Sequence, residues 1–138
     1  MAADAQYSHD GIHDRLTHCA APPILYSHLE RMISGSSRTG ASLTLVSISI
    51  PITSSLEQIL SIAHDIIRLM RQEDLCGRMG EFQFVVVLSG SATHGEKFLE
   101  RIREGVSVAF TSELVQWASE ETSLQLLYRL DRAAEITL

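Results

Sequence analysis

Apolar residues recur at intervals of three and four along much of the chain, which is the spacing of one face of an α-helix. The stripes with this spacing predict helices over residues 22–33, 54–72, 93–102 and 122–130. Pro22 and Pro23 fit the first turn of the first helix, where a backbone N–H has no partner within the helix. The run GSSRTG at residues 35–40 then predicts the end of that helix and a loop.

The other three helices are each preceded by a capping-box spacing. In this motif the side chain of a Ser or Thr accepts a hydrogen bond from the backbone N–H three residues later. A Glu or Gln at that later position accepts in turn from the backbone N–H of the Ser or Thr. The pairs are Ser54 with Glu57, Thr93 with Glu96, and Thr122 with Gln125. These pairs predict the first residues of the helices.

Shorter apolar runs between the helices predict strands. Residues 42–50 alternate in pattern, and both faces are fairly apolar, as in a central strand that Pro51 closes. Gly77 and Gly80 predict a hairpin whose second arm is residues 82–88. Two further short strands are predicted at 106–110 and 114–117. This order of elements predicts an α/β (α+β) domain with a mostly antiparallel sheet covered by helices.

Length and composition describe an ordinary globular protein. The 138 residues fit one domain, and 45% hydrophobic with 20% charged residues is the balance of a folded chain. A net charge of −6 provides no general attraction for nucleic acid or anionic lipid, so we expect neither a nucleic acid nor a membrane as partner. No apolar run is long enough to span a bilayer and no signal peptide is present, which predicts a cytoplasmic protein.

Cysteine and histidine spacings indicate no metal centre. Cys19 and Cys76 have neither CxxC nor zinc-type spacing, and reduced thiols are expected. His9 and His13 lie four residues apart near the N-terminus, but Gly11 between them favours solvated polar residues over a metal site.

Four stretches, in this order, resemble motifs of one family. HDRLT at residues 13–17 is similar to a DxLT start, and the strand at 43–50 to one that ends in an IDxDxFK-like motif. RMGEFQF at 78–84 is similar to an R-Y-G-G-D-E-F hairpin, and LQLLYRLDR at 124–132 to a final LLxxAD helix. The chain therefore resembles the GGDEF family, the diguanylate cyclase domain. The resemblance implies a palm-like sheet flanked by helices, with a lead segment at residues 1–13 and a degenerate GGDEF-like domain at 14–138.

The resemblance also implies that the catalytic motif is degenerate. Joining two GTP molecules requires acidic ligands for Mg²⁺, and the two ligand positions fall on Ser47 and Phe82. Gly80 keeps the first glycine of the turn, whereas Glu81 replaces the second and places a negative side chain where phosphate would lie. Gln83 and Phe84 complete the motif.

Two further parts of the family pattern are missing. The segment that reads guanine after the first strand is shortened, and the Lys after the last helix is absent. We therefore expect no cyclase activity, no metal and no cofactor.

A second family site is retained. Members often have an inhibitory RxxD site five residues before the GGDEF turn, and Arg71 and Asp74 match it in register, with Arg101 as the further arginine and Arg103 as a near alternative. An Arg fork binds phosphate, and a carboxylate accepts from the guanine edge. The pattern leaves open whether these residues bind cyclic di-GMP or are solvated surface charges.

These observations support several hypotheses for the function. The first is a catalytically inactive GGDEF-like domain with a regulatory or protein-interaction role in cyclic di-GMP signalling, whose partner is a signalling protein, a second copy of the chain, or both. The alternative is a cyclic di-GMP receptor that uses the RxxD site. A cyclase with displaced ligands is a third, and a generic ferredoxin-like interaction domain is the fallback.

Three other side chains have structural interpretations. Arg78 is either a partner of a carboxylate or a phosphate ligand, Trp117 is expected in the core or an interface, and Cys76 is expected to fill space beside the turn.

Overall fold

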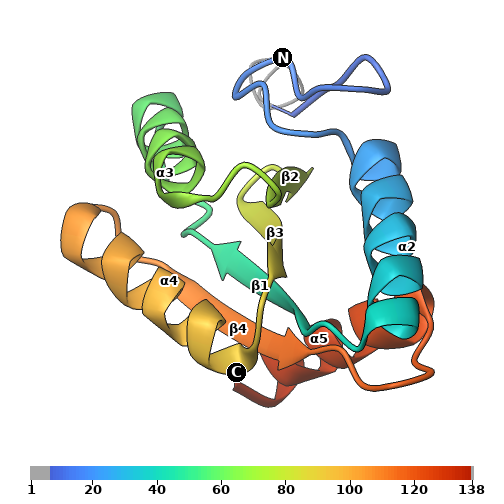
Figure 1. The fold of residues 1–138 in the computed structure, drawn as a ribbon. Helices are drawn as coiled ribbons and strands as arrows, with labels where there is room; N and C mark the ends of the chain where they lie inside the picture. Colours follow the sequence, from blue (N-terminus) through green and yellow to red (C-terminus); the bar gives the residue numbers. More distant parts are fainter. Residues whose placement is uncertain (1–6, 138) are drawn as a thin grey trace.

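A four-stranded antiparallel sheet, in the order β2-β3-β1-β4, forms the centre of the molecule (Figure 1). The computed structural model describes the backbone of residues 7–137 and the side chains of residues 7–134. The strands are β1 (Leu43–Ser49), β2 (Leu75–Gly80), β3 (Gln83–Ser89) and β4 (Thr111–Gln116). The helices of the described part are α2 (Pro22–Thr39), α3 (Leu56–Leu69), α4 (Ala92–Gly105) and α5 (Ser123–Thr137). The predicted α+β class with an antiparallel sheet and flanking helices is confirmed.

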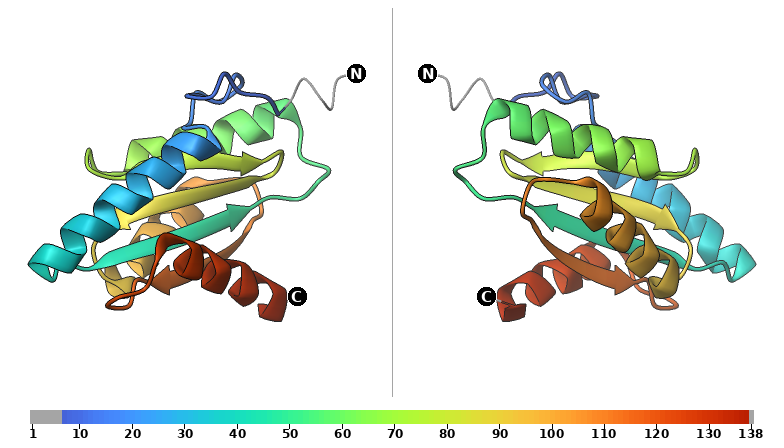
Figure 2. Two further views of the ribbon diagram at one scale, coloured as in Figure 1. Left: turned by 90° about the vertical axis from the view of Figure 1, so that its right-hand side faces the viewer. Right: turned by 90° about the vertical axis from the view of Figure 1, so that its left-hand side faces the viewer.

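The helices cover the two faces of the sheet in pairs. Figure 2 shows α2 and α5 on one face and α3 and α4 on the other. Successive residues of β1 and β3 therefore point into different cores, which explains why both faces of these strands are apolar. Val46, Ile48 and Phe84 lie in the core beneath α3 and α4, whereas Leu45 and Val85 lie in the core beneath α2 and α5.

The segment that precedes α2 protects the edge of the sheet. Ala20 forms a parallel bridge with Gly77, and its backbone N donates to the Cys76 carbonyl at 2.9 Å. A Cβ at residue 77 would come within 2.7 Å of Leu25 Cδ1, so glycine allows the close approach of β2 to α2. Figure 2 shows this segment beside β2, at the opposite end of the sheet from β4. An exposed strand edge is thereby covered.

Two helix ends differ from the predictions. The first helix continues through residues 35–39, and Gly40, whose φ is 78°, is its C-cap. The loop predicted at 35–40 is therefore wrong, because Ser36 is buried and Thr39 Oγ1 bonds back to the Gly35 carbonyl at 3.0 Å. Helix α3 ends at Leu69, one turn earlier than predicted.

The capping boxes were predicted correctly in only one case. The pair Thr122 and Gln125 exchanges the two expected hydrogen bonds, at 2.9 and 3.1 Å. At α3 the box is formed by Ser55 and Gln58, one residue later than predicted. The box predicted from Thr93 is wrong, because α4 starts at Ala92 and its N-cap makes no side-chain hydrogen bond.

The predicted strand at residues 106–110 is also wrong. This segment is irregular and leads from α4 into β4, which begins at Thr111. Its apolar residues pack instead of pairing: Val108 is buried in the core beneath α3 and α4, and Phe110 packs against that core. The strand predicted at 114–117 lies largely within β4.

Candidate functional site

The β2–β3 hairpin places the residues at which the GGDEF-like motif was predicted. Gly80 pairs with Gln83, and the register shifts between Arg78 and Gly80, so that Glu81 and Phe82 form the tip. The Phe82 carbonyl accepts a hydrogen bond from the backbone N of Ile50 at 2.9 Å. The tip is thus joined to the chain that follows β1.

The two positions predicted to replace metal ligands lie against the core and within the central strand. Phe82 packs against the core beneath α3 and α4. Ser47 is buried in the central strand, opposite Val85 of β3 and Glu113 of β4. Within residues 7–134 no group of three His, Cys, Asp or Glu side chains is arranged to hold a metal ion.

A buried ion pair fixes the hairpin to the segment that precedes α2. Arg78 is fully buried, and its Nη1 donates to both carboxylate oxygens of Asp14, at 3.1 and 3.2 Å. Asp14 Oδ2 also accepts from the backbone N and the Oγ1 of Thr17, both at 2.8 Å. Arg78 Nη2 also donates to the Glu81 carbonyl at 2.7 Å, and this hydrogen bond stabilises the tip of the hairpin. Of the two interpretations of Arg78, the structure supports the partner of a carboxylate.

A tyrosine ring and two cysteine thiols lie near this ion pair. The Tyr7 ring lies 5.3 Å from the Arg78 guanidinium carbon, and burial raises the pKa of Tyr7 above its ordinary value. Cys19 and Cys76 are free and buried in the same core. A hydrogen bond between the two thiols lowers the pKa of Cys19 and raises the pKa of Cys76, which burial also raises. Cys76 lies within β2, where its side chain is buried in the core beneath α3 and α4.

The RxxD residues adopt a tight turn between α3 and β2. Asp74 Oδ2 accepts from the backbone N of Arg71 at 3.0 Å, and Asp74 Oδ1 accepts from the backbone N of Ser89 at 2.9 Å. Asp74 is buried, and its charge opposes the lowering of the pKa of His28 on α2 that burial and Arg31 cause. Its carboxylate therefore caps the backbone amides of Arg71 and Ser89.

Arg71 and Arg101 line one cavity. It has a volume of about 190 Å³ and lies between the end of α3 and the exposed side of α4. Its lining residues are Leu69, Arg71, His94, Lys97, Phe98 and Arg101. The structure thus brings together two of the three residues predicted for ligand binding and leaves Asp74 out. Arg103, the near alternative, points elsewhere, because its guanidinium donates to Ser112 Oγ at 3.1 Å.

Sequence reasoning missed His94 and Lys97. Both precede Arg101 on one face of α4, at spacings of seven and four residues. Arg71 Nη2 lies 3.4 Å from His94 Nδ1, which links α4 to the RxxD turn. A basic stripe at helical spacing, opposite the RxxD turn, was the available signal.

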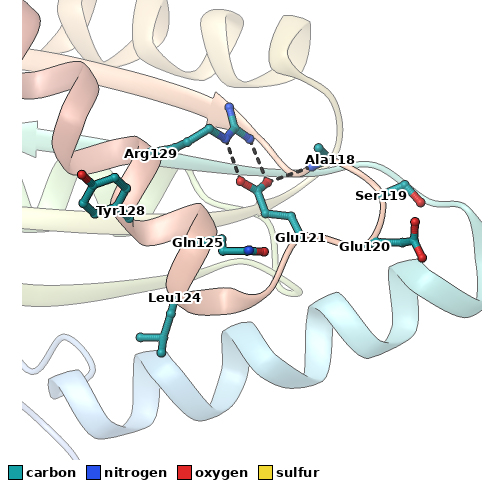
Figure 3. A pocket seen from close by; sticks show the side chains of 8 residues that line it. All are labelled: Ala118, Ser119, Glu120, Glu121, Leu124, Gln125, Tyr128 and Arg129. Carbon is teal, nitrogen blue, oxygen red and sulfur yellow. Dashed lines mark hydrogen bonds and ion pairs between the residues drawn. The ribbon is translucent and has the colours of Figure 1, made fainter.

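A second hollow lies on another part of the described surface. Its volume is about 690 Å³, and it lies between the loop before α5 and the exposed side of α5 (Figure 3). Figure 3 shows its one arginine bound to its neighbour: Arg129 Nε and Nη2 donate to the Glu121 carboxylate at 2.7 and 2.9 Å. This ion pair lowers the pKa of Glu121 and raises the pKa of Arg129. Leu124 and Tyr128 line the rest of the hollow.

The fold is shared with solved GGDEF domains. The diguanylate cyclase SiaD from Pseudomonas aeruginosa, solved with its activator SiaC, superposes with a TM-score of 0.76 and 23% identity over 90% of this chain and 56% of SiaD. The GGDEF domain of DgcB from Caulobacter crescentus, solved with c-di-GMP, gives 0.85 and 18% over 94% and 91% of the two chains. The GGDEF domain of YfiN from Pseudomonas aeruginosa gives 0.78 and 21% over 90% and 87%.

These identities establish the fold alone. The chain has the fold of a GGDEF domain and spans about half the length of SiaD. No protein-family model matches the sequence, and the search of curated proteins gives no match. No helix of residues 7–137 is long and apolar enough to cross a membrane.

Proposed function

We propose that this chain is a GGDEF-like domain without cyclase activity, which acts as a regulatory and protein-interaction module in cyclic di-GMP signalling. The observation that supports this most directly is the hairpin tip. Phe82 packs against the core at a position where the resemblance requires a carboxylate, and the buried hydroxyl of Ser47 stands at the other. Mg²⁺ prefers charged oxygen ligands, and neither side chain supplies one.

The other contacts of the tip support a structural role for the motif, in which it holds the shape of the hairpin. Arg78 bonds to the Glu81 carbonyl, and Asp14 neutralises Arg78 inside the protein. These contacts preserve the shape of the hairpin independently of a nucleotide. We propose that the retained scaffold presents a surface to a signalling protein or to a second copy of the chain. SiaD bound to its activator illustrates a GGDEF fold in complex with a protein partner.

Metal-dependent binding of GTP tests this proposal. GTP is titrated into the protein by calorimetry, with and without Mg²⁺ or Mn²⁺. Because the protein offers no acidic ligands, the divalent ion is expected to leave the affinity for GTP unchanged or to reduce it. A reduction would arise because the ion competes with protein groups for the phosphates of GTP. A metal ion that strengthens GTP binding tenfold or more, with the gain lost in Glu81→Ala, would support a cyclase with displaced ligands instead.

One specific observation favours the second candidate, a receptor for cyclic di-GMP. Arg71 and Arg101 come from separate elements, and both line the cavity beside α4. DgcB, which shares the fold, was solved with c-di-GMP. Calorimetric titration with the monomeric and the intercalated dimeric nucleotide, repeated on Arg71→Ala, tests this candidate. Heat that is lost in the variant supports it, and the absence of heat with either form rejects it.

A further inference from the structure

The two cysteines of the chain meet at the edge of the sheet. Ala20, in the segment before α2, forms a parallel bridge with Gly77 of β2. In this bridge the backbone N of Ala20 donates to the Cys76 carbonyl at 2.9 Å, and its carbonyl accepts from the backbone N of Arg78 at 3.1 Å. Cys19 and Cys76 each lie one residue before the bridged pair. The bridge therefore places them side by side in the same register.

Both cysteine side chains point to the same face of the sheet. Successive side chains alternate between the faces of a strand, and residues directly opposite each other share a face. A Cβ at Gly77 would meet Leu25 of α2, so the neighbouring Cys76 faces away from α2. Cys19 and Cys76 accordingly both lie in the core beneath α3 and α4. Their thiols are free and are joined by a hydrogen bond.

The backbone spacing at this position suits a disulfide bond. Neighbouring strands lie about 4.8 Å apart, and disulfides join Cα atoms that are about 4.4–6.8 Å apart. The hydrogen bonds of Ala20 hold the two backbones at strand spacing, and the two sulfurs already touch. A bond between them therefore requires rotation of two side chains and no movement of a helix or strand.

The surroundings make the two sulfurs chemically unequal. The hydrogen bond from Cys76, with a further one to Thr17, lowers the pKa of Cys19. The same bond and burial raise the pKa of Cys76. Because the thiolate is the form that attacks an oxidant, Cys19 is the sulfur that reacts first.

A small oxidant reaches Cys19 through the segment before α2. Cys19 is buried, but the preceding His18 is exposed and has a φ of 64°, a left-handed conformation that is uncommon for a residue other than glycine. Local opening of this segment exposes the Cys19 thiol without the opening of a helix.

We infer that Cys19 and Cys76 are a modification site, at which a peroxide converts the two thiols into an intramolecular disulfide bond. The Cys19 thiolate attacks one oxygen of hydrogen peroxide, which forms a sulfenic acid and releases hydroxide. The Cys76 sulfur then attacks the Cys19 sulfur and loses its proton, and the sulfenic hydroxyl leaves as water. The released hydroxide takes up the proton that Cys19 had lost. Two thiols are thus oxidised, and one peroxide is reduced to two molecules of water.

The disulfide would fasten the segment before α2 to β2. In the reduced protein this segment is held by the hydrogen bonds of Ala20 and by the ion pair of Asp14 with Arg78. The new bond closes a loop from residue 19 to residue 76, which restricts the unfolded chain and favours the folded one. This role goes beyond the proposed regulatory function and depends on neither GTP nor cyclic di-GMP.

Oxidation of the intact protein tests the inference. The folded protein is treated with hydrogen peroxide, unreacted thiols are alkylated in denaturant, and the product is analysed by mass spectrometry. We expect a monomer without alkylated cysteine, in which a proteolytic peptide with Cys19 is linked to one with Cys76. Alkylation of both cysteines after treatment would overturn the inference, and so would disulfide-linked dimers in place of the internal bond.

A glutathione redox buffer measures whether the fold favours the bond. The ratio of disulfide to dithiol is determined at a fixed mixture of reduced and oxidised glutathione, in the folded protein and in concentrated urea. We expect a ratio at least about tenfold higher in the folded protein, because its loop is already closed. By linkage, the oxidised protein should then unfold at higher urea concentration than the reduced protein. A ratio that rises less than tenfold would contradict a bond that the fold prepares.

Two single variants control for other effects of peroxide, such as oxidation of the four methionines. In Cys19→Ala and Cys76→Ala, peroxide should leave the urea midpoint without an increase, since neither variant can form the internal bond. Circular dichroism checks that each variant folds, and the glutathione measurement needs neither variant. An increase of the midpoint in a single variant equal to that of the unchanged protein would overturn the stabilising role of the disulfide.

Discussion

Replacing Asp14 by Asn tests the buried ion pair that joins the segment before α2 to the hairpin. Both members of the pair are almost inaccessible to solvent, since Arg78 is 0% and Asp14 is 1% exposed. The Asn side chain keeps one oxygen that can accept from Thr17, but it carries no charge. The variant therefore leaves the Arg78 cation buried without its counter-charge.

The expected cost follows from this burial. Removing one partner of a buried pair typically costs about 3–5 kcal/mol, because the other charge stays desolvated. A domain of this kind is stable by about 5–15 kcal/mol, so Asp14→Asn should remove a large share of its free energy of unfolding. With a urea dependence of about 1–3 kcal/mol per molar, the midpoint of unfolding should fall by about 2 M.

Urea unfolding monitored by circular dichroism measures this cost. Asp65→Asn provides a matched control, because it removes the same charge from the ion pair with Arg68, whose side chain is 52% exposed. A surface pair of this kind contributes at most about 1 kcal/mol. If Asp14→Asn lowers the free energy of unfolding no more than Asp65→Asn does, the ion pair does not fasten the hairpin as described.

Three further predictions concern the surroundings of the two sites. Asp74→Ala removes the acceptor of two backbone amides and should lower the free energy of unfolding by about 1–3 kcal/mol in urea. Burial lowers the pKa of His28 in the folded protein, so the unfolded chain binds a proton at this residue at higher pH than the folded chain does. The free energy of unfolding should therefore fall as pH drops below 6.5, and it should fall more steeply than in His28→Gln. Thermal unfolding at several pH values measures both. Gly77→Ala should cost about 1–3 kcal/mol in the same urea assay, since its Cβ meets the fully buried Leu25; an unchanged midpoint would contradict the close packing of β2 on α2.

Periodicity was sufficient for most of the architecture. The alternation in residues 42–50 predicted a central strand, and β1 does lie between β3 and β4 with both faces buried. The glycines at 77 and 80 predicted the hairpin. Short apolar segments were harder, because a run such as 106–110 fits a strand or an irregular stretch that fills a core, and only its tertiary neighbours decide between them.

Helix ends depended on competition between neighbouring residues. Ser54 and Ser55 are both suitable N-caps, and the choice of Ser55 lies in the position of Gln58, whose side chain returns the bond. The run at 35–39 contains glycine and serine, which are weak helix formers, yet Ser36 is buried and the helix continues to Thr39. Local propensity alone does not contain this packing.

The sequence predicted some members of the candidate site but not its geometry. The register of the RxxD pattern located Arg71, and the family resemblance suggested Arg101, which the structure places on the same cavity. Asp74 is oriented toward backbone amides partly by Ser89, which lies 15 residues later in the sequence, and no local pattern predicts this contact. The contact between Asp14 and Arg78 spans 64 positions of sequence, and only the folded chain brings these residues together.

Product formation from GTP tests the central proposal most directly. The protein is incubated with GTP and Mg²⁺, and separately with Mn²⁺, and the mixture is separated by chromatography beside an active diguanylate cyclase as reference. Our account predicts no cyclic dinucleotide above a no-enzyme control, because Ser47 and Phe82 provide no metal ligand. Formation of cyclic di-GMP that disappears in Glu81→Ala would contradict it, since the hairpin tip would then be an active site.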